Sequence, residues 1–526
     1  MKRREFLKHS ATGLAMVALG SLMPWPKIWG SSNALAASAA GFAELDLEMV
    51  EVDAEMVDTV RVPMWAFRLG EHEDHDDDNG SSSGDHSDLS LPRIPGPALV
   101  ALEGDRIRLR ITNLIGQGGA HGFAIPGVVG PVTIPHHGTV EVEFIAPAPG
   151  TYMYLDPINA PVNRVMGLHG ALVVLPNPVG GNGTPYRNPT ANIQNLFDDL
   201  GRTDHFPGHP WDMERNAIWV FNVIDPVKAD QADSSSPISP AAFLSGFLPQ
   251  YFTLNGKSGF FSAQHHHVAA GNGDEEHEHG FENFLSFAGR TFDLQSNISI
   301  SGRVGQPILI RNLNAGLAWH SPHIHGNHVY QLTDPNGVIQ NNLNFLDTWA
   351  VPPMARIDLL LPFTRPPDIP ADSLVVGTTR TAWPPVEERF PLVYPTHDHN
   401  ELSNTAAGGN YPQGLVTHWQ IDGDIDPRNI VIFVDQADLR VRTGRLELSG
   451  RISSIPPGPA VMLVVHAGGP DGEMITHSIQ ADAQGSWSFR ARALKAMDTR
   501  IVTLMYHDPS DSSLVHASRT VPLRLR

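Results

Sequence analysis

Two short stretches of the sequence carry histidines at spacings that could hold a transition metal. The stretch HSPHIHG contains His323 and His325, and the stretch HDH contains His397 and His399. In an extended strand, residues i and i+2 lie on the same face, so each stretch predicts two imidazoles that converge on one side. Imidazole nitrogens bind copper, zinc, iron and nickel, and the order of affinities favours copper.

Two other residues accompany these histidines. His320 begins the first stretch, and Asp398 separates the two histidines of the second. Alternation along a strand turns Asp398 to the face opposite the histidines, toward His320. We therefore expect His320 and Asp398 to form a polar layer behind the metal ligands.

The chain has 26 His and no Cys. The absence of Cys excludes disulfides, thiolate nucleophiles, zinc–Cys sites and iron–sulfur clusters. It also excludes blue copper of the His₂Cys type, which requires a thiolate ligand. A bound transition metal must therefore use imidazole and carboxylate ligands.

Short alternating runs between turn residues predict an all-β protein of several domains. Its 526 residues suggest two to four domains, and Gly 48 and Pro 44 fit a turn-rich β fold. The clearest alternation is at Arg106–Thr112. We expect one domain at 45–176 and a second at 215–424, joined by a Pro/Asn/Gly-rich connector at 177–214. Several short strands at 439–526 predict an immunoglobulin-like β-sandwich.

Two polar inserts interrupt these domains, at 71–88 and at 264–280. Both are too polar to pack and are expected to form loops. Their histidines and carboxylates could bind metal loosely, although such loops are more often simply solvated. Outside the inserts, His136, His137 and His169 fit no ligand pattern and are expected at the surface or behind the ligands.

The first two domains resemble the cupredoxin domains of the multicopper oxidase family. In the first domain the similar motifs are PGP, GTYMY and GLHGALVV, and in the second they are NGK, GQPILIRNLN, HSPHIHG, DTWAVPP and HDH. The resemblance covers residues 45–424 and implies two plastocyanin-like Greek-key barrels. The two-domain count is similar to that of small laccases and copper nitrite reductases.

Four histidine motifs define that family, and this chain keeps part of them. The first, normally H-x-H, keeps only His121, and the second reads YLDP around Asp156 and has lost both histidines. The third, H-x-x-H-x-H-G, is intact. The fourth, normally H-C-H-x-x-x-H, has Asp398 in place of Cys, Ser403 in place of the last His, and Leu415 where the axial Met follows.

The resemblance therefore implies a lost blue-copper site, of which only His320 remains, and a partly retained trinuclear centre. The type 2 position would keep both imidazoles and the type 3 pair would keep three of six. The implied metal ligands are His121, His323, His325, His397 and His399. One or two copper ions are expected, with zinc possible.

Three functions remain open at this point. The first is a copper oxidoreductase that works without blue copper and activates oxygen or another small molecule at an open position. Laccase-type turnover is not expected, because no blue copper would accept electrons from the reductant. The second is a protein that stores or delivers copper, and the third is a metal-free envelope scaffold.

The N-terminus, residues 1–36, is typical of a twin-arginine signal peptide. Arg3 and Arg4 begin the run RREFLK, an apolar run follows, and Ala34-Leu35-Ala36 is a cleavage site. The apolar run is shorter than the ~20 residues that span a bilayer. We therefore expect a periplasmic mature protein with no membrane span.

The formal net charge, 36 minus 56 or −20, argues against a nucleic-acid partner, which would require a basic face. The expected partners are small molecules or metal ions. Because His121 lies in the first domain and the other ligands in the second, the two must meet across an interface. A homotrimeric ring of the kind seen in two-domain relatives is slightly preferred over folding within one chain through the connector.

Overall fold

The computed structural model describes residues 42–70, 93–116, 119–176, 183–212, 215–234, 237–263, 290–292, 298–366, 372–376, 379–383, 389–425, 431–440, 443–453, 462–467, 473–482, 485–491, 501–507 and 515–525. The expected signal peptide at 1–36 and the polar inserts at 71–88 and 264–280 lie outside these residues. None of the described helices is long and apolar enough to cross a membrane.

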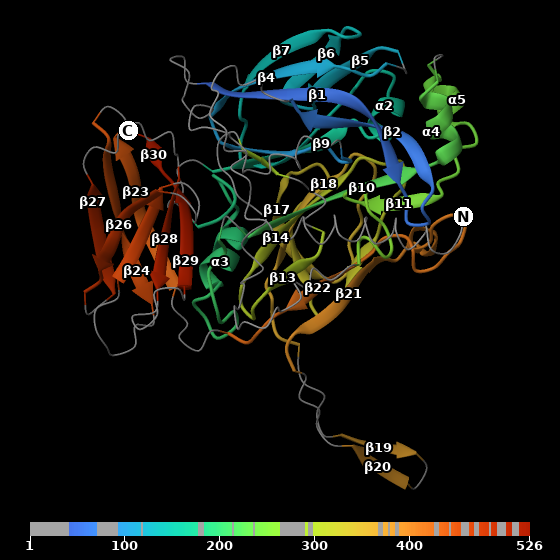
Figure 1. Ribbon diagram of the computed structural model, residues 1–526. Coiled ribbons are helices and arrows are strands. Elements are labelled where there is room, and N and C mark those ends of the chain that lie inside the picture. Colours follow the sequence, from blue (N-terminus) through green and yellow to red (C-terminus); the bar gives the residue numbers. More distant parts are fainter. Residues whose placement is uncertain are drawn as a thin grey trace, which may run out of the picture.

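The all-β fold predicted from the sequence is confirmed (Figure 1). The strands of the first barrel are β1 (Phe42–Glu55), β2 (Arg61–Leu69), β3 (Ala98–Leu102), β4 (Arg106–Asn113), β5 (His121–Ile125), β6 (Val129–Ile134), β7 (Thr139–Ile145), β8 (Gly150–Leu155), β9 (His169–Leu175) and β12 (Arg290–Phe292). One sheet has the order β2-β1-β4-β7 and the other β12-β3-β9-β8-β5-β6. Strand β12 falls in the range expected for the second barrel, yet it pairs with β3 of the first.

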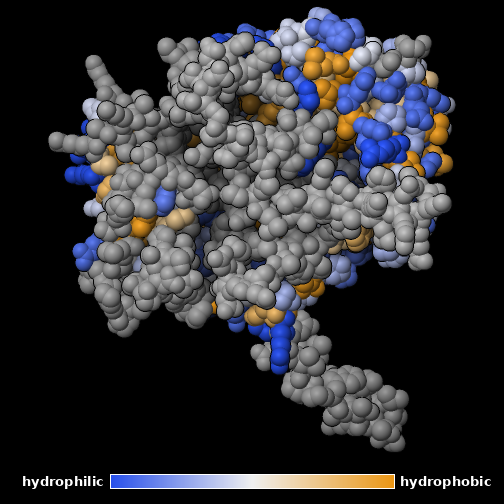
Figure 2. Space-filling model, in the orientation of Figure 1, coloured by the Kyte–Doolittle hydropathy of each residue, from blue (hydrophilic) through white to orange (hydrophobic). Residues whose placement is uncertain are grey.

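The sheet β2-β1-β4-β7 has one face in the core and one face in water. Strand β4 shows this arrangement, since its side chains alternate between buried and more exposed positions, as its sequence predicts. Ile107, Leu109 and Ile111 point into the core. Arg108, on the other face, forms ion pairs with Glu44 and Glu143 of the neighbouring strands. Hydrophilic and hydrophobic residues are mixed on the face of this barrel that Figure 2 shows at the upper right, as expected for a sheet exposed on one side.

The second barrel also pairs two sheets. Its strands are β10 (Asn216–Ile224), β11 (Tyr251–Leu254), β13 (Ile300–Gly302), β14 (Ile308–Asn314), β15 (Pro322–Ile324), β16 (Val329–Thr333), β17 (Ile339–Leu346), β18 (Arg356–Leu361), β21 (Leu392–Asp398) and β22 (Val416–Ile421). Their orders are β11-β10-β14-β18-β16-β17 and β13-β22-β21-β15. Strand β10 is buried along its whole length, because Trp219 and Phe221 face the barrel core while Ile218 and Val220 face the first barrel.

The C-terminal region forms the two-sheet sandwich that the sequence predicts. Its strands are β23 (Val431–Arg440), β24 (Arg445–Ser453), β25 (Met462–Ala467), β26 (Glu473–Gln480), β27 (Ser486–Ala491), β28 (Ile501–His507), β29 (Val515–Pro522) and β30 (Arg524–Leu525). The sheets, ordered β27-β24-β23-β30 and β26-β25-β28-β29, enclose a core of their own. A separate hairpin pairs β19 (Asp372–Val376) with β20 (Thr379–Trp383).

Short helices lie between the strands. They are α2 (Val162–Val165), α3 (Ala191–Asp199), α4 (Pro226–Ala232), α5 (Pro240–Leu244) and the 3₁₀ turn η2 (Glu401–Asn404). Helix α3 lies in the range 177–214, which the sequence analysis expects to connect the two domains. Its residues Ile193, Leu196 and Phe197 are buried in the core between the barrels.

A buried polar network also joins the two barrels within one chain. Arg311 of the second barrel donates from Nη1 to Thr151 Oγ1 of the first barrel, at 2.9 Å. The same Nη1 lies 3.3 Å from Asp358 Oδ2, and the Tyr186 hydroxyl donates to that oxygen at 2.9 Å. Barrel docking therefore combines an apolar core with a buried ion pair between Arg311 and Asp358. It holds in place the second barrel, which carries the histidine motifs.

Candidate metal centre

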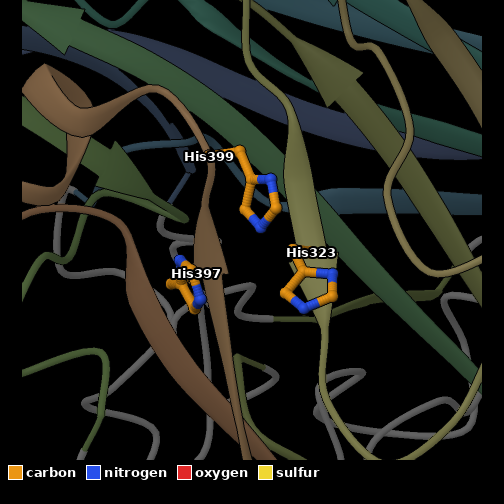
Figure 3. Close-up of side chains that lie close together, drawn as sticks. All are labelled: His323, His397 and His399. Atoms are coloured by element: carbon orange, nitrogen blue, oxygen red, sulfur yellow. The ribbon is translucent and has the colours of Figure 1, made fainter.

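Strands β15 and β21 bring the two histidine motifs face to face. The strands pair antiparallel with His323 directly opposite His397. The backbone N–H of His399 donates to Ser321 O at 2.9 Å, which continues the pairing past the end of β21. Figure 3 shows His323, His397 and His399 converging from the two strands. The i,i+2 alternation thus places the side chains on one face, and the strand register brings them together.

The ring nitrogens of the cluster lie close together. One nitrogen from each of His323, His397 and His399 can be chosen so that all three lie within 4.8 Å of one another. His325 adds a fourth ring, whose Nε2 lies 3.1 Å from Nε2 of His397. Two nitrogens about 2.0 Å from one metal ion lie about 2.8 to 3.3 Å apart at bond angles between square and tetrahedral. The pair therefore has the separation of two ligands of the same ion.

Hydrogen bonds orient two of these rings for metal binding. His323 Nδ1 lies 3.0 Å from both Asp347 O and Thr348 Oγ1, and His397 Nδ1 lies 3.0 Å from Asp398 O. A carbonyl oxygen only accepts, so Nδ1 carries the proton and donates in both rings, and each Nε2 keeps its lone pair. Such contacts fix the tautomer and direction of metal-ligating histidines. The donor set therefore fits copper or zinc, which bind neutral imidazole.

The outer side of the cluster is open to solvent. His325 and His399 are exposed, while His323 and His397 are half-buried. Burial lowers the pKa of His325, and repulsion from His323, His397 and His399, which acts when those rings are protonated, lowers it further. A ring with a lowered pKa is neutral at neutral pH, as a ligand must be. The carboxylate of Asp347, 3.9 Å from His323 Nδ1, adds negative charge that favours a cation.

Asp398 points away from the ligands, into the barrel, and contacts His320. Asp398 Oδ2 lies 2.7 Å from His320 Nδ1, and both side chains are buried. Oδ1 accepts from the backbone N–H of Ser321 and Asn400 at 2.7 and 3.0 Å. Burial alone would raise the pKa of Asp398, but the hydrogen bond and charge of His320 and the two backbone donors together hold it below its ordinary value. This is the polar layer that strand alternation leads one to expect.

The structure does not bring His121 to the other four histidines. His121 is fully buried in the first barrel, where its Nδ1 lies 2.9 Å from Asp156 Oδ2 and its ring packs edge-on against Trp65. Asn163 donates to the same carboxylate oxygen at 2.9 Å. His121 is therefore not among the histidines that this structure gathers, and both its role as a ligand and the homotrimer stay predictions.

Other residues differ from the expectations in informative ways. His136 and His137 are exposed, as expected, but His169 is fully buried, with Nδ1 donating to Arg164 O at 2.8 Å. Asp347 and Thr348, which hold His323, were not predicted to act at the site. They begin the run DTWAVPP, which the sequence analysis noted only as a motif similar to those of the family.

Comparison with known proteins gave likenesses to solved structures alone, since no family model and no curated protein matches the chain. The chain is similar to the blue copper oxidase from Nitrosomonas europaea (TM-score 0.45, 18% identity, 72% of this chain and 85% of that chain). It is also similar to the multicopper oxidase mgLAC (0.43, 19%, 72% and 86%) and to the copper nitrite reductase from Nitrosomonas europaea (0.42, 14%, 73% and 96%). At these identities the likeness extends to the fold alone.

Proposed function

We propose that this chain is an exported, periplasmic copper protein with an oxidoreductase centre formed by four histidines of its second barrel. The observation that carries the proposal is the convergence of His323, His397 and His399 within 4.8 Å, with His325 Nε2 3.1 Å from His397 Nε2. The twin-arginine motif and the Ala34-Leu35-Ala36 site support export.

Copper held by these imidazoles would supply one-electron redox chemistry. The surrounding residues would orient the ligands and leave the centre open to a small molecule. His323 and His397 are held by backbone carbonyls, so their Nε2 atoms would keep a fixed direction. The exposed edges of His325 and His399 leave one side of the centre accessible to a small molecule. With no Cys in the chain, electrons must arrive from a reductant at this face and not through a blue-copper site.

The same exposure favours a second candidate, a protein that binds copper and hands it on. Exposed ligands exchange with an incoming ligand more readily than buried ones, because no packing must be broken. A turnover assay distinguishes the oxidoreductase from the copper carrier. An oxidoreductase loaded with copper consumes oxygen or another small oxidant in the presence of a reductant, whereas a carrier passes copper to a competing chelator without net oxidation.

The site itself is tested by copper titration of purified mature protein, with metal content and electron paramagnetic resonance recorded on the same sample. We expect one tight ion per chain. The double variant His323→Ala/His399→Ala should lose it. The matched control is His136→Ala/His137→Ala, which removes an exposed adjacent pair from the other barrel and should leave the tight ion in place.

Deletion of residues 264–280 provides a further control, because it removes the histidine-rich insert and leaves the four histidines. It should release only weakly bound ions. Loss of the tight ion in this deletion, or its retention in the His323/His399 double variant, would show that the centre lies elsewhere.

A further inference from the structure

The structure assigns a positioning role to Asn404, which we propose holds the copper ligand His397 in its binding orientation through the peptide group of Asp398. This inference rests on the function proposed above. It concerns a residue outside the histidine motifs, and it explains why His397 faces the centre from the end of a strand.

The contacts that carry the inference meet at one backbone carbonyl. Asp398 O accepts the Nδ1–H of His397 at 3.0 Å and the Nδ2–H of Asn404 at 2.6 Å. Asn404 Oδ1 in turn accepts the backbone N–H of Asp398 at 3.3 Å, and the carbonyl of Leu415 accepts the same N–H at 3.2 Å. The shorter contact of Asn404 is the one to Asp398 O, and it fixes the oxygen to which His397 donates.

Asn404 is itself firmly held. It ends the turn η2 and is 3% exposed. Its own carbonyl accepts the N–H of Gly414 at 3.1 Å, and the carbonyl of Ser403 accepts the N–H of Leu415 at 2.8 Å. A Cβ at Gly414 would clash with the Ser403 carbonyl, so the two backbone segments lie in close contact. The contacts within residues 403–415 thus fix the position of Asn404, and Asn404 in turn fixes the end of β21, the strand that carries His397.

The competing explanation is that Asn404 only stabilises the fold. The chain offers a matched control in Asn255, a fully buried residue whose amide likewise contacts one N–H and one carbonyl of a strand, here two residues of β10. Asn255 Oδ1 accepts from Val220 N and Nδ2 donates to Ile218 O, both at 2.8 Å. Both partners lie in β10, a strand that carries none of the four histidines. Asn255→Ala should therefore lower the stability of the chain as Asn404→Ala does, but it should leave copper binding at the four histidines unchanged.

The experiment measures copper affinity, by competition with a chelator, and the electron paramagnetic resonance spectrum of the copper-loaded chain. Loss of a group that orients a ligand typically costs about 10- to 100-fold in metal affinity. We expect a loss of that size in Asn404→Ala, with a nitrogen splitting that reports one imidazole fewer. Asn404→Asp keeps the size of the side chain but removes the donor, so it should show the same change if the alanine variant folds poorly. Asn255→Ala should bind copper like the parent chain.

A His397→Ala background separates an action through His397 from a general effect. If Asn404 acts through that ring, Asn404→Ala should add no further loss of affinity there. Unchanged affinity and spectrum in Asn404→Ala, or equal added losses with and without His397, would overturn the positioning role. A parent chain that binds no copper would instead overturn the proposed function, so the two failures are distinguishable.

Discussion

His320 and Asp398 form a buried pair in the second barrel, with Nδ1 and Oδ2 2.7 Å apart. His121 and Asp156 form an equivalent pair in the first barrel at 2.9 Å. In both pairs the remaining nitrogen of the ring, Nε2, is buried with no protein partner in the described structure. Both barrels therefore contain a buried His–Asp pair. Among the described residues, the Asp of the second barrel is the one that lies between two proposed metal ligands, His397 and His399.

This difference predicts separable effects of removing the two carboxylates. Removal of either carboxylate leaves a buried imidazole N–H without its acceptor, which costs about 1 to 3 kcal/mol of stability, so Asp398→Ala and Asp156→Ala should be similarly destabilised in urea unfolding. Only Asp398→Ala should weaken copper binding, because Asp398 Oδ1 anchors the backbone N–H groups of Ser321 and Asn400 beside the ligands. Equal copper affinity in both variants would contradict this assignment.

The network between the barrels predicts a large effect at Arg311. Arg311→Met should lower the free energy of unfolding by about 3 kcal/mol, because it leaves the buried Asp358 carboxylate without its ion pair. The comparison is Arg108→Met. The ion pairs of Arg108 with Glu44 and Glu143 lie at the surface, where a pair contributes under about 1 kcal/mol. Comparable losses in the two variants would argue against the network as a determinant of barrel docking.

His169 predicts a defined loss of stability at acidic pH. Burial lowers the pKa of His169 from 6.5 to about 4. Between these values the unfolded chain binds a proton that the folded chain excludes, so stability falls as pH decreases from 6.5 toward 4 and is unaffected above 6.5. The total contribution is about 3 kcal/mol, at 1.36 kcal/mol for each pKa unit. In His169→Gln, stability measured from pH 7 to 4.5 should depend less steeply on pH than in the parent chain. Identical slopes would show that another group is responsible.

The absence of Cys predicts the colour of the copper form. An intense blue band requires charge transfer from a thiolate to copper, and the chain has no thiolate. Copper-loaded protein should be nearly colourless, with weak absorption from imidazole ligation. An intense blue colour in pure protein would contradict the assignment of Asp398 to the position of the lost Cys.

Local patterning alone fixes much of the fold. Arg106–Thr112 was predicted as a strand and β4 spans Arg106–Asn113, because alternation of apolar and polar residues is readable without tertiary information. Strand β17 was missed, since its sequence IQNNLNFL is polar and half-exposed. It forms because β16 supplies backbone partners and α3 packs beside it, which no local pattern records.

The candidate site divides in the same way. The i,i+2 spacing determined that His323 and His325 share a face, that His397 and His399 share a face, and that Asp398 points elsewhere, because side-chain direction in a strand has a period of two. The register that sets His323 opposite His397 was decided by tertiary structure. Tertiary structure also decided the position of His121. Its imidazole is like the others, but the packing of the first barrel encloses it with Asp156. Residue type and spacing determine which side chains are able to bind a metal, whereas burial and long-range pairing decide which of them meet.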